Sequence, residues 1–65
     1  MKISYFQETD TLYFELDEST SVESNEVSPG VVFDFDQNNK IVGIEIEKAS
    51  NLVNLKSLPI SKSNP

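Results

Sequence analysis

The segment VVFDFDQNNKIVGIEI, residues 31–46, contains two runs of alternating apolar and polar residues around a short polar stretch. Alternation with a period of two is typical of a strand that buries one face. A two-residue turn at Asn38 and Asn39, both with positive φ, would join two such strands. This turn pairs Val31 with Ile46, Phe33 with Ile44 and Phe35 with Val42 on one face, and Val32 with Glu45, Asp34 with Gly43 and Asp36 with Ile41 on the other. A slip of one residue would break every apolar pair, so the sequence predicts a β-hairpin in this register.

The same segment has the oxygen-ligand spacing of a calcium-binding EF-hand loop, which is the alternative interpretation. An EF-hand needs glycine where Asn39 stands, and it needs two flanking helices. The flanks SPGVVF and VGIEIEK have β-branched residues and strand-like alternation instead. We therefore expect the hairpin, and we keep Asp34 and Asp36 only as candidate ligands for weak binding of a divalent cation.

The rest of the chain predicts a first hairpin and a short helix. KISYF and TLYFELD are β-rich and are joined by the polar QETD, which predicts two more antiparallel strands. The polar, serine-rich residues 18–29 are expected to form a loop with a short edge strand near Glu26 and Val27. Beyond Glu47, leucines at 52, 55 and 58 with a proline at 59 predict one short helix.

These elements predict an α+β fold. It has an antiparallel sheet of about four strands, in two hairpins, with one short C-terminal helix packed on one face. We expect a single small domain over residues 1–58 and a flexible tail at residues 59–65.

Composition limits the functions that this chain can have. The 65 residues carry a net charge of -6, and all five basic residues are lysine, so direct binding to nucleic acid is not expected. Without cysteine or histidine there is no thiolate or imidazole to bind a metal or to act as a nucleophile or base. We therefore predict that the protein is not an enzyme and has no cofactor. The sequence shows no signal peptide layout and no membrane-length apolar run, which predicts a cytoplasmic protein.

Alternation also predicts an acidic sheet face opposite the helix. A mixed acidic and apolar surface of this kind can steer a basic protein towards an apolar centre, although it can also serve only for solubility. A homodimer through the apolar members Tyr13, Val32 and Ile41 is the other possibility. The predicted partner-binding residues are Tyr13, Glu15, Asp17, Val32, Asp34, Asp36, Ile41, Glu45 and Glu47.

Two segments resemble a known family. KISYFQETDTLYFEL and VSPGVVFDFDQNNKIVGIEIEKAS are similar to the YuzE-like family, domain of unknown function 2283, over about residues 2 to 50. The chain departs from the family pattern in two ways: Asn38-Asn39 replaces an Asp-Gly turn, and Glu15 stands where many members have a basic residue. The resemblance implies a small α+β fold without an established activity. It also suggests an antitoxin-like partner of a basic RNase-like toxin.

Overall fold

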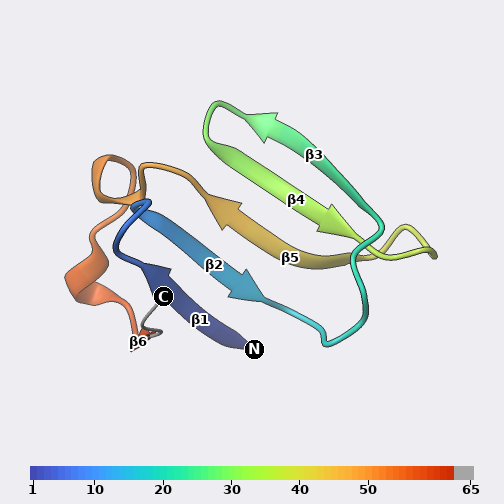
Figure 1. Ribbon diagram of the computed structural model, residues 1–65, viewed down its shortest axis with the longest axis horizontal. Helices are drawn as coiled ribbons and strands as arrows, with labels where there is room; N and C mark the ends of the chain where they lie inside the picture. Colours follow the sequence, from blue (N-terminus) through green and yellow to red (C-terminus); the bar gives the residue numbers. More distant parts are fainter. Residues whose placement is uncertain (63–65) are drawn as a thin grey trace.

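One sheet forms most of the structure, which is a computed structural model that describes residues 1–62 (Figure 1). Five strands pair antiparallel, and a sixth, of two residues, lies parallel to β1. Their order across the sheet is β3-β4-β5-β2-β1-β6. The strands are β1 (Lys2–Phe6), β2 (Thr11–Glu15), β3 (Glu23–Ser28), β4 (Val31–Phe35), β5 (Ile41–Ile46) and β6 (Ser61–Lys62).

Both predicted hairpins are present. In the first, β1 pairs with β2 so that Ile3 faces Phe14 and Tyr5 faces Leu12. In the second, β4 pairs with β5 in the predicted register at four positions: Val31 with Ile46, Val32 with Glu45, Phe33 with Ile44 and Asp34 with Gly43. The register follows from the alternation, because Val31 faces Ile46 and Phe33 faces Ile44 on the apolar side, and these two pairs fix the other two.

The turn of the second hairpin differs from the prediction. Only Asn39 has a positive φ, of 66°, whereas Asn38 does not. The Asp36 carboxylate accepts hydrogen bonds from the backbone N–H groups of Asn38 (2.8 Å) and Lys40 (3.0 Å), which favours a three-residue loop with one left-handed residue. As a result, the register shifts beyond Asp34, and Phe35 pairs with Ile41 instead of Val42.

The edge strand β3 is longer than the short strand predicted near Glu26 and Val27, and all six of its residues are exposed. Its pairing with β4 is irregular between Glu26 and Ser28, which leaves Val27 outside the ladder. Pro29 and Gly30 then turn the chain into β4, and the φ of 81° at Gly30 suits glycine in such a turn.

The predicted C-terminal helix is wrong. The structure has two 3-10 turns, η1 (Ala49–Asn51) and η2 (Leu55–Ser57), and no α-helix within residues 1–62. The three-residue spacing of the leucines fits a 3-10 turn as well as one face of a helix. The Asn54 side chain accepts a hydrogen bond from the Lys56 N–H and so begins a separate turn. The fold is therefore mostly β.

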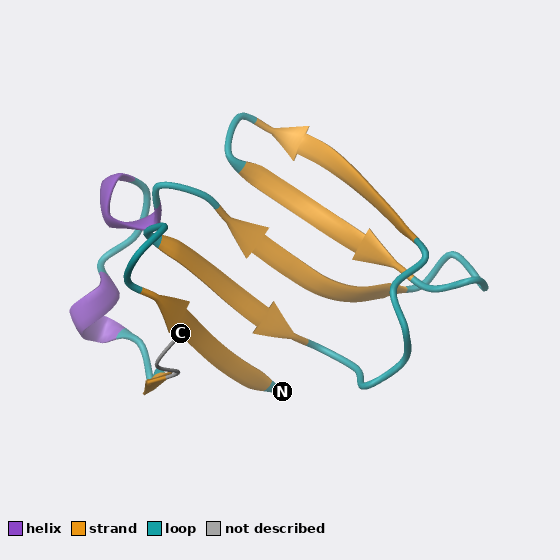
Figure 2. Cartoon of the chain, viewed as in Figure 1, coloured by secondary structure: helices purple, strands orange, loops and turns teal. Residues whose placement is uncertain are grey.

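The core lies between the β1-β2-β5 side of the sheet and the chain that follows β5. Ile3, Leu12 and Ala49 are buried there, and partly buried side chains of both η segments pack against them. Figure 2 shows the two 3-10 turns at the end of the sheet where β2 begins and β5 ends. Of the predicted tail, Ile60 packs against this core and Ser61–Lys62 forms β6, while residues 63–65 lie outside the described part of the chain.

Candidate functional site

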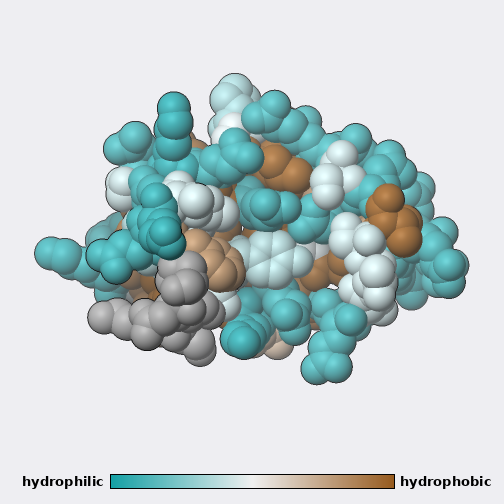
Figure 3. All heavy atoms as spheres, in the orientation of Figure 1, coloured by the Kyte–Doolittle hydropathy of each residue, from teal (hydrophilic) through white to brown (hydrophobic). Residues whose placement is uncertain are grey.

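Two cross-strand rows of side chains form the sheet face opposite the core. The first row pairs Tyr13 with Glu45, Glu45 with Val32 and Val32 with Glu26. The second pairs Lys2 with Glu15, Glu15 with Gly43, Gly43 with Asp34 and Asp34 with Ser24. Figure 3 views this side of the sheet, where hydrophilic residues predominate and hydrophobic ones form small separate areas. We define the acidic face as Tyr13, Glu15, Glu26, Val32, Asp34 and Glu45.

Tyr13 occupies the centre of the acidic face. Its ring lies across Gly43, so closely that a Cβ atom at position 43 would be 2.8 Å from the ring carbon Cζ. Glycine is thus needed here to admit a flat aromatic ring from the neighbouring strand. This arrangement gives the face an apolar centre surrounded by carboxylates.

Asp34 lies beneath that surface. Its side chain is only 5% exposed and accepts a hydrogen bond of 2.5 Å from the Ser24 hydroxyl. A buried carboxylate requires such partners. Asp34 therefore shapes the acidic face and its charge, but offers little area for contact.

Negative charge is concentrated around Tyr13. Partial burial, followed by the charge of Asp34 and more weakly that of Glu47, raises the pKa of the Glu45 carboxyl. Burial first, and then the charges of Asp34, Glu45 and Glu15, raise the pKa of the Tyr13 hydroxyl. Both shifts mean that adding another negative charge is unfavourable here, and that a positive group from a partner would be favoured.

The other predicted residues are not part of this face. Asp17 lies exposed in the loop after β2 and accepts a hydrogen bond from Ser19. The Asp36 carboxylate binds the backbone of its own turn, and Glu47 lies just beyond β5, at the border. Ile41 pairs with Phe35 and therefore lies on the opposite side of the sheet. The predicted homodimer surface of Tyr13, Val32 and Ile41 is thus not one continuous surface.

Sequence reasoning missed Ser24 and Glu26 as members of this region. Residues 23–26 are all polar and therefore lack the apolar and polar alternation that would indicate a strand. Their place beside β4 depends on the long connection from β2, which the local sequence does not specify.

The hairpin interpretation of the EF-hand-like segment is confirmed, because strands flank its loop. Within residues 1–62, no group of three or more acidic side chains is arranged to hold a metal ion. The two candidate ligands, Asp34 and Asp36, already accept hydrogen bonds from the protein.

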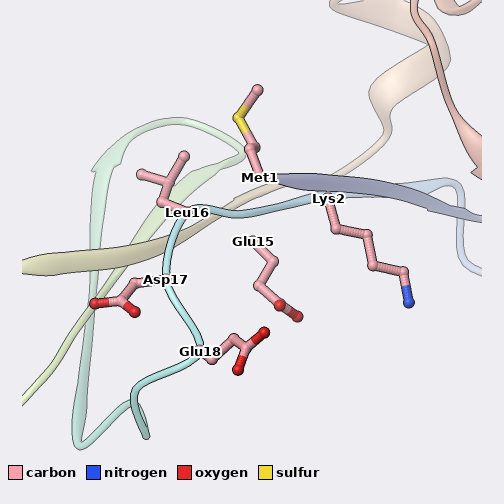
Figure 4. Close-up of a pocket in the computed structure, with 6 residues that line it drawn as sticks. All are labelled: Met1, Lys2, Glu15, Leu16, Asp17 and Glu18. Atoms are coloured by element: carbon pink, nitrogen blue, oxygen red, sulfur yellow. The ribbon is translucent and has the colours of Figure 1, made fainter.

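A hollow of about 490 Å³ lies beside the acidic face, where β1 begins and β2 ends (Figure 4). It is lined by Met1, Lys2, Glu15, Leu16, Asp17 and Glu18. The Lys2, Glu15 and Glu18 side chains all lie on the same side of the ribbon, and the ammonium end of Lys2 points away from the two carboxylates. The hollow thus adds to the negative border of the acidic face.

A second polar cluster joins the turn between β1 and β2 to the segment after β5. Asp10, at φ 55°, accepts hydrogen bonds from the hydroxyls of Tyr5 (2.6 Å) and Ser50 (2.6 Å), and its carbonyl accepts from the N–H of Ala49 (2.8 Å). The bonds from Ser50 and Tyr5 lower the pKa of the Asp10 carboxyl. Asp10 thus anchors the segment after β5 to the turn between β1 and β2.

The comparisons with known proteins give a family and no function. A family model described as a protein of unknown function, DUF2283, matches residues 2–50, which is 49 of the 65 residues. No curated protein matches the chain, and no solved structure matches it. Over the described residues, no helix is both long and apolar enough to cross a membrane.

Proposed function

Because this chain belongs to DUF2283, a family of proteins of unknown function, we propose from its acidic face that it is a non-enzymatic module that binds a basic protein. The observation that carries the proposal is the pair of cross-strand rows that places Glu15, Glu45 and the buried Asp34 around Tyr13, with Glu26 at the far end of its row. Carboxylates around an aromatic centre can steer a cationic partner and then bury an apolar contact.

The electrostatic strain at Glu45 supports this proposal. Burial first, and then the neighbouring carboxylates, raise the pKa of the Glu45 carboxyl, and an approaching cation offsets the part that is due to repulsion. A surface that served only for solubility would gain more from charges spread apart than from charges crowded around one tyrosine.

A more specific form of the proposal is that the protein acts as an antitoxin. In that role, the acidic face would cover the cationic RNA-binding surface of an RNase-like toxin, and complementary charge would speed the association. The net charge of -6 and the absence of arginine fit a protein that competes with RNA for such a surface.

The test compares two charge-reversal variants of equal net charge. The first carries Glu15→Lys and Glu26→Lys, both on the acidic face. The control carries Glu8→Lys and Glu23→Lys, two exposed acids away from this face: Glu8 lies in the loop before β2, and Glu23 pairs with Phe35 on the other side of the sheet. Asp34 stays unchanged, because a lysine at this buried position would disrupt the fold.

Basic proteins captured from a lysate by the wild-type chain at low salt are purified, and their association rates with all three chains are measured. We expect the acidic-face variant to associate at least about tenfold more slowly than the control. Equal rates for the two variants, or no basic protein captured by the wild type, would contradict the proposal. Inhibition of RNA cleavage by a captured nuclease would support the antitoxin form.

A further inference from the structure

The side of the sheet that bears the core is only partly covered. Besides the buried residues near η1, it carries a second group of apolar side chains that pack against none of them. Cross-strand pairing places Phe33 beside Ile44 and Phe35 beside Ile41 on this side. Figure 4 shows that Met1 and Leu16 also extend to one side of the ribbon, opposite Lys2 and Glu15. We define the open apolar face as Met1, Leu16, Phe33, Phe35, Ile41 and Ile44.

The border of this surface is accessible to solvent, whereas Val42, which follows Ile41 in β5, is only 2% exposed. Leu16 and Ile41 are each 40% exposed, and Met1 is more exposed still. Phe33, Phe35 and Ile44 are half-buried, and the rings of the two phenylalanines lie 6.4 Å apart. An apolar sheet face normally packs against a second layer. Within residues 1–62, the helical turns supply that layer at one end of the sheet only (Figure 2).

Charge is distributed so that a second copy can provide the missing layer. None of the six side chains of the open apolar face is charged, and the acidic face lies on the other side of the sheet. Glu23, which pairs with Phe35, stands only at the exposed edge. Two sheets pack about 10 Å apart, so the outward acidic faces of two copies would be separated by more than the roughly 8 Å screening length at physiological salt.

The size of the face sets the scale of the contact. The broad side of the molecule spans 33 by 23 Å, and the helical turns cover one end of it (Figure 2). The open apolar face is therefore only a part of this side, and the interface is small compared with the roughly 800 Å² that each partner contributes to a standard one. A two-fold axis brings the same patch of both copies together, so an uncharged apolar patch is complementary to itself.

We propose that a second copy of this chain packs against the open apolar face, forming a two-layer homodimer with both acidic faces outward. The proposal does not depend on the partner of the acidic face, since that face remains accessible in the dimer. It also supplies the second layer that a 65-residue chain lacks.

The first test is the mass of the wild-type chain in solution. Sedimentation equilibrium between 1 and 100 μM should show a species of twice the 7.3 kDa chain mass. A chain that remains monomeric at 100 μM would overturn the proposal, whatever other partner then covers the face.

The second test locates the interface with two variants of equal charge. Leu16→Glu with Ile41→Glu places two charges in the open apolar face. The control, Val22→Glu with Val27→Glu, places them at other exposed valines, which are 63% and 51% exposed. We expect the first variant to raise the dimer Kd at least about 100-fold and the control to change it less than about threefold.

Circular dichroism of both variants checks that the sheet is retained. We expect both variants to fold, because all four substituted positions are at least 40% exposed. A dimer that survives Leu16→Glu with Ile41→Glu, or that is lost only in the control, would place the interface elsewhere and refute the proposal. If the first variant does not fold, single Ile41→Glu and Val22→Glu variants repeat the comparison.

Discussion

Replacing Gly43 with alanine should destabilise this protein, although the same change in most strands does the opposite. Glycine in a strand costs roughly 0.5–1 kcal/mol relative to alanine, because it loses more backbone freedom on folding. The backbone at Gly43 does not have a positive φ, so alanine fits it locally. The obstacle is Tyr13, whose Cζ and Cε1 atoms lie 2.8 and 3.1 Å from the position of a new Cβ.

The expected magnitude follows from these opposing terms. Inserting a methyl group into an occupied space typically costs about 1–3 kcal/mol, here through displacement of the Tyr13 ring. Subtracting the backbone gain leaves a net loss of about 1 kcal/mol in the free energy of unfolding. In a domain of this size, that loss lowers Tm by roughly 4–8 °C.

A double-mutant cycle with Tyr13→Ala tests the cause. Without the ring, Gly43→Ala should stabilise the fold by about 0.5–1 kcal/mol, so the sign of its effect reverses. Urea unfolding followed by far-ultraviolet circular dichroism, at one protein concentration, measures all four chains. If Gly43→Ala has the same effect with and without Tyr13, the ring does not rest on the glycine and the reasoning is wrong.

Three further substitutions test other parts of the fold. Glu45→Gln should stabilise it at pH 7 by about 0.5 kcal/mol, because it removes a charge that is partly buried and repelled by Asp34; the gain is small because solvent screens this charge. Because the folded pKa of Glu45 is raised, the gain should vanish as pH falls below 4.5, and a gain that persists there would refute this cause. Asp10→Asn should destabilise the fold at pH 7. Because the folded pKa of Asp10 is lowered, the difference in the free energy of unfolding from the wild type should shrink below pH 3.8, which unfolding curves measure. Leu12→Ala should lower the free energy of unfolding by about 3 kcal/mol, because Leu12 is fully buried. Leu52→Ala, at a position 52% exposed, should lower it by less than about 0.5 kcal/mol. Similar melting temperatures for the two variants would contradict the described core.

The alternation of residues 31–46 determined the second hairpin and the face on which each residue lies, as far as Asp34 and Gly43. This succeeded because the side-chain period of a strand is a local property, and because several apolar pairs constrain one register together. The first hairpin followed from the same period.

The turn shows where local reasoning ends. Asp36 binds two backbone N–H groups and selects a three-residue loop, and the resulting shift moves Ile41 to the other side of the sheet. A single residue in a turn thus changed one member of the predicted binding surface, because every residue beyond a register shift changes its face.

Tertiary structure decided the rest. Asp10 and Ser50 are 40 positions apart and meet only because β5 lies beside β2, while Asp34 is buried only because β3 lies beside β4. The leucine spacing suited both a helix and 3-10 turns, and a segment this short takes its form from the surface against which it packs. The sequence alone therefore determined the two hairpins and, apart from Ile41, the faces of their strands, through local periodicity. The order of the strands, and with it the charge and the exposed area of each face, came from contacts between distant positions.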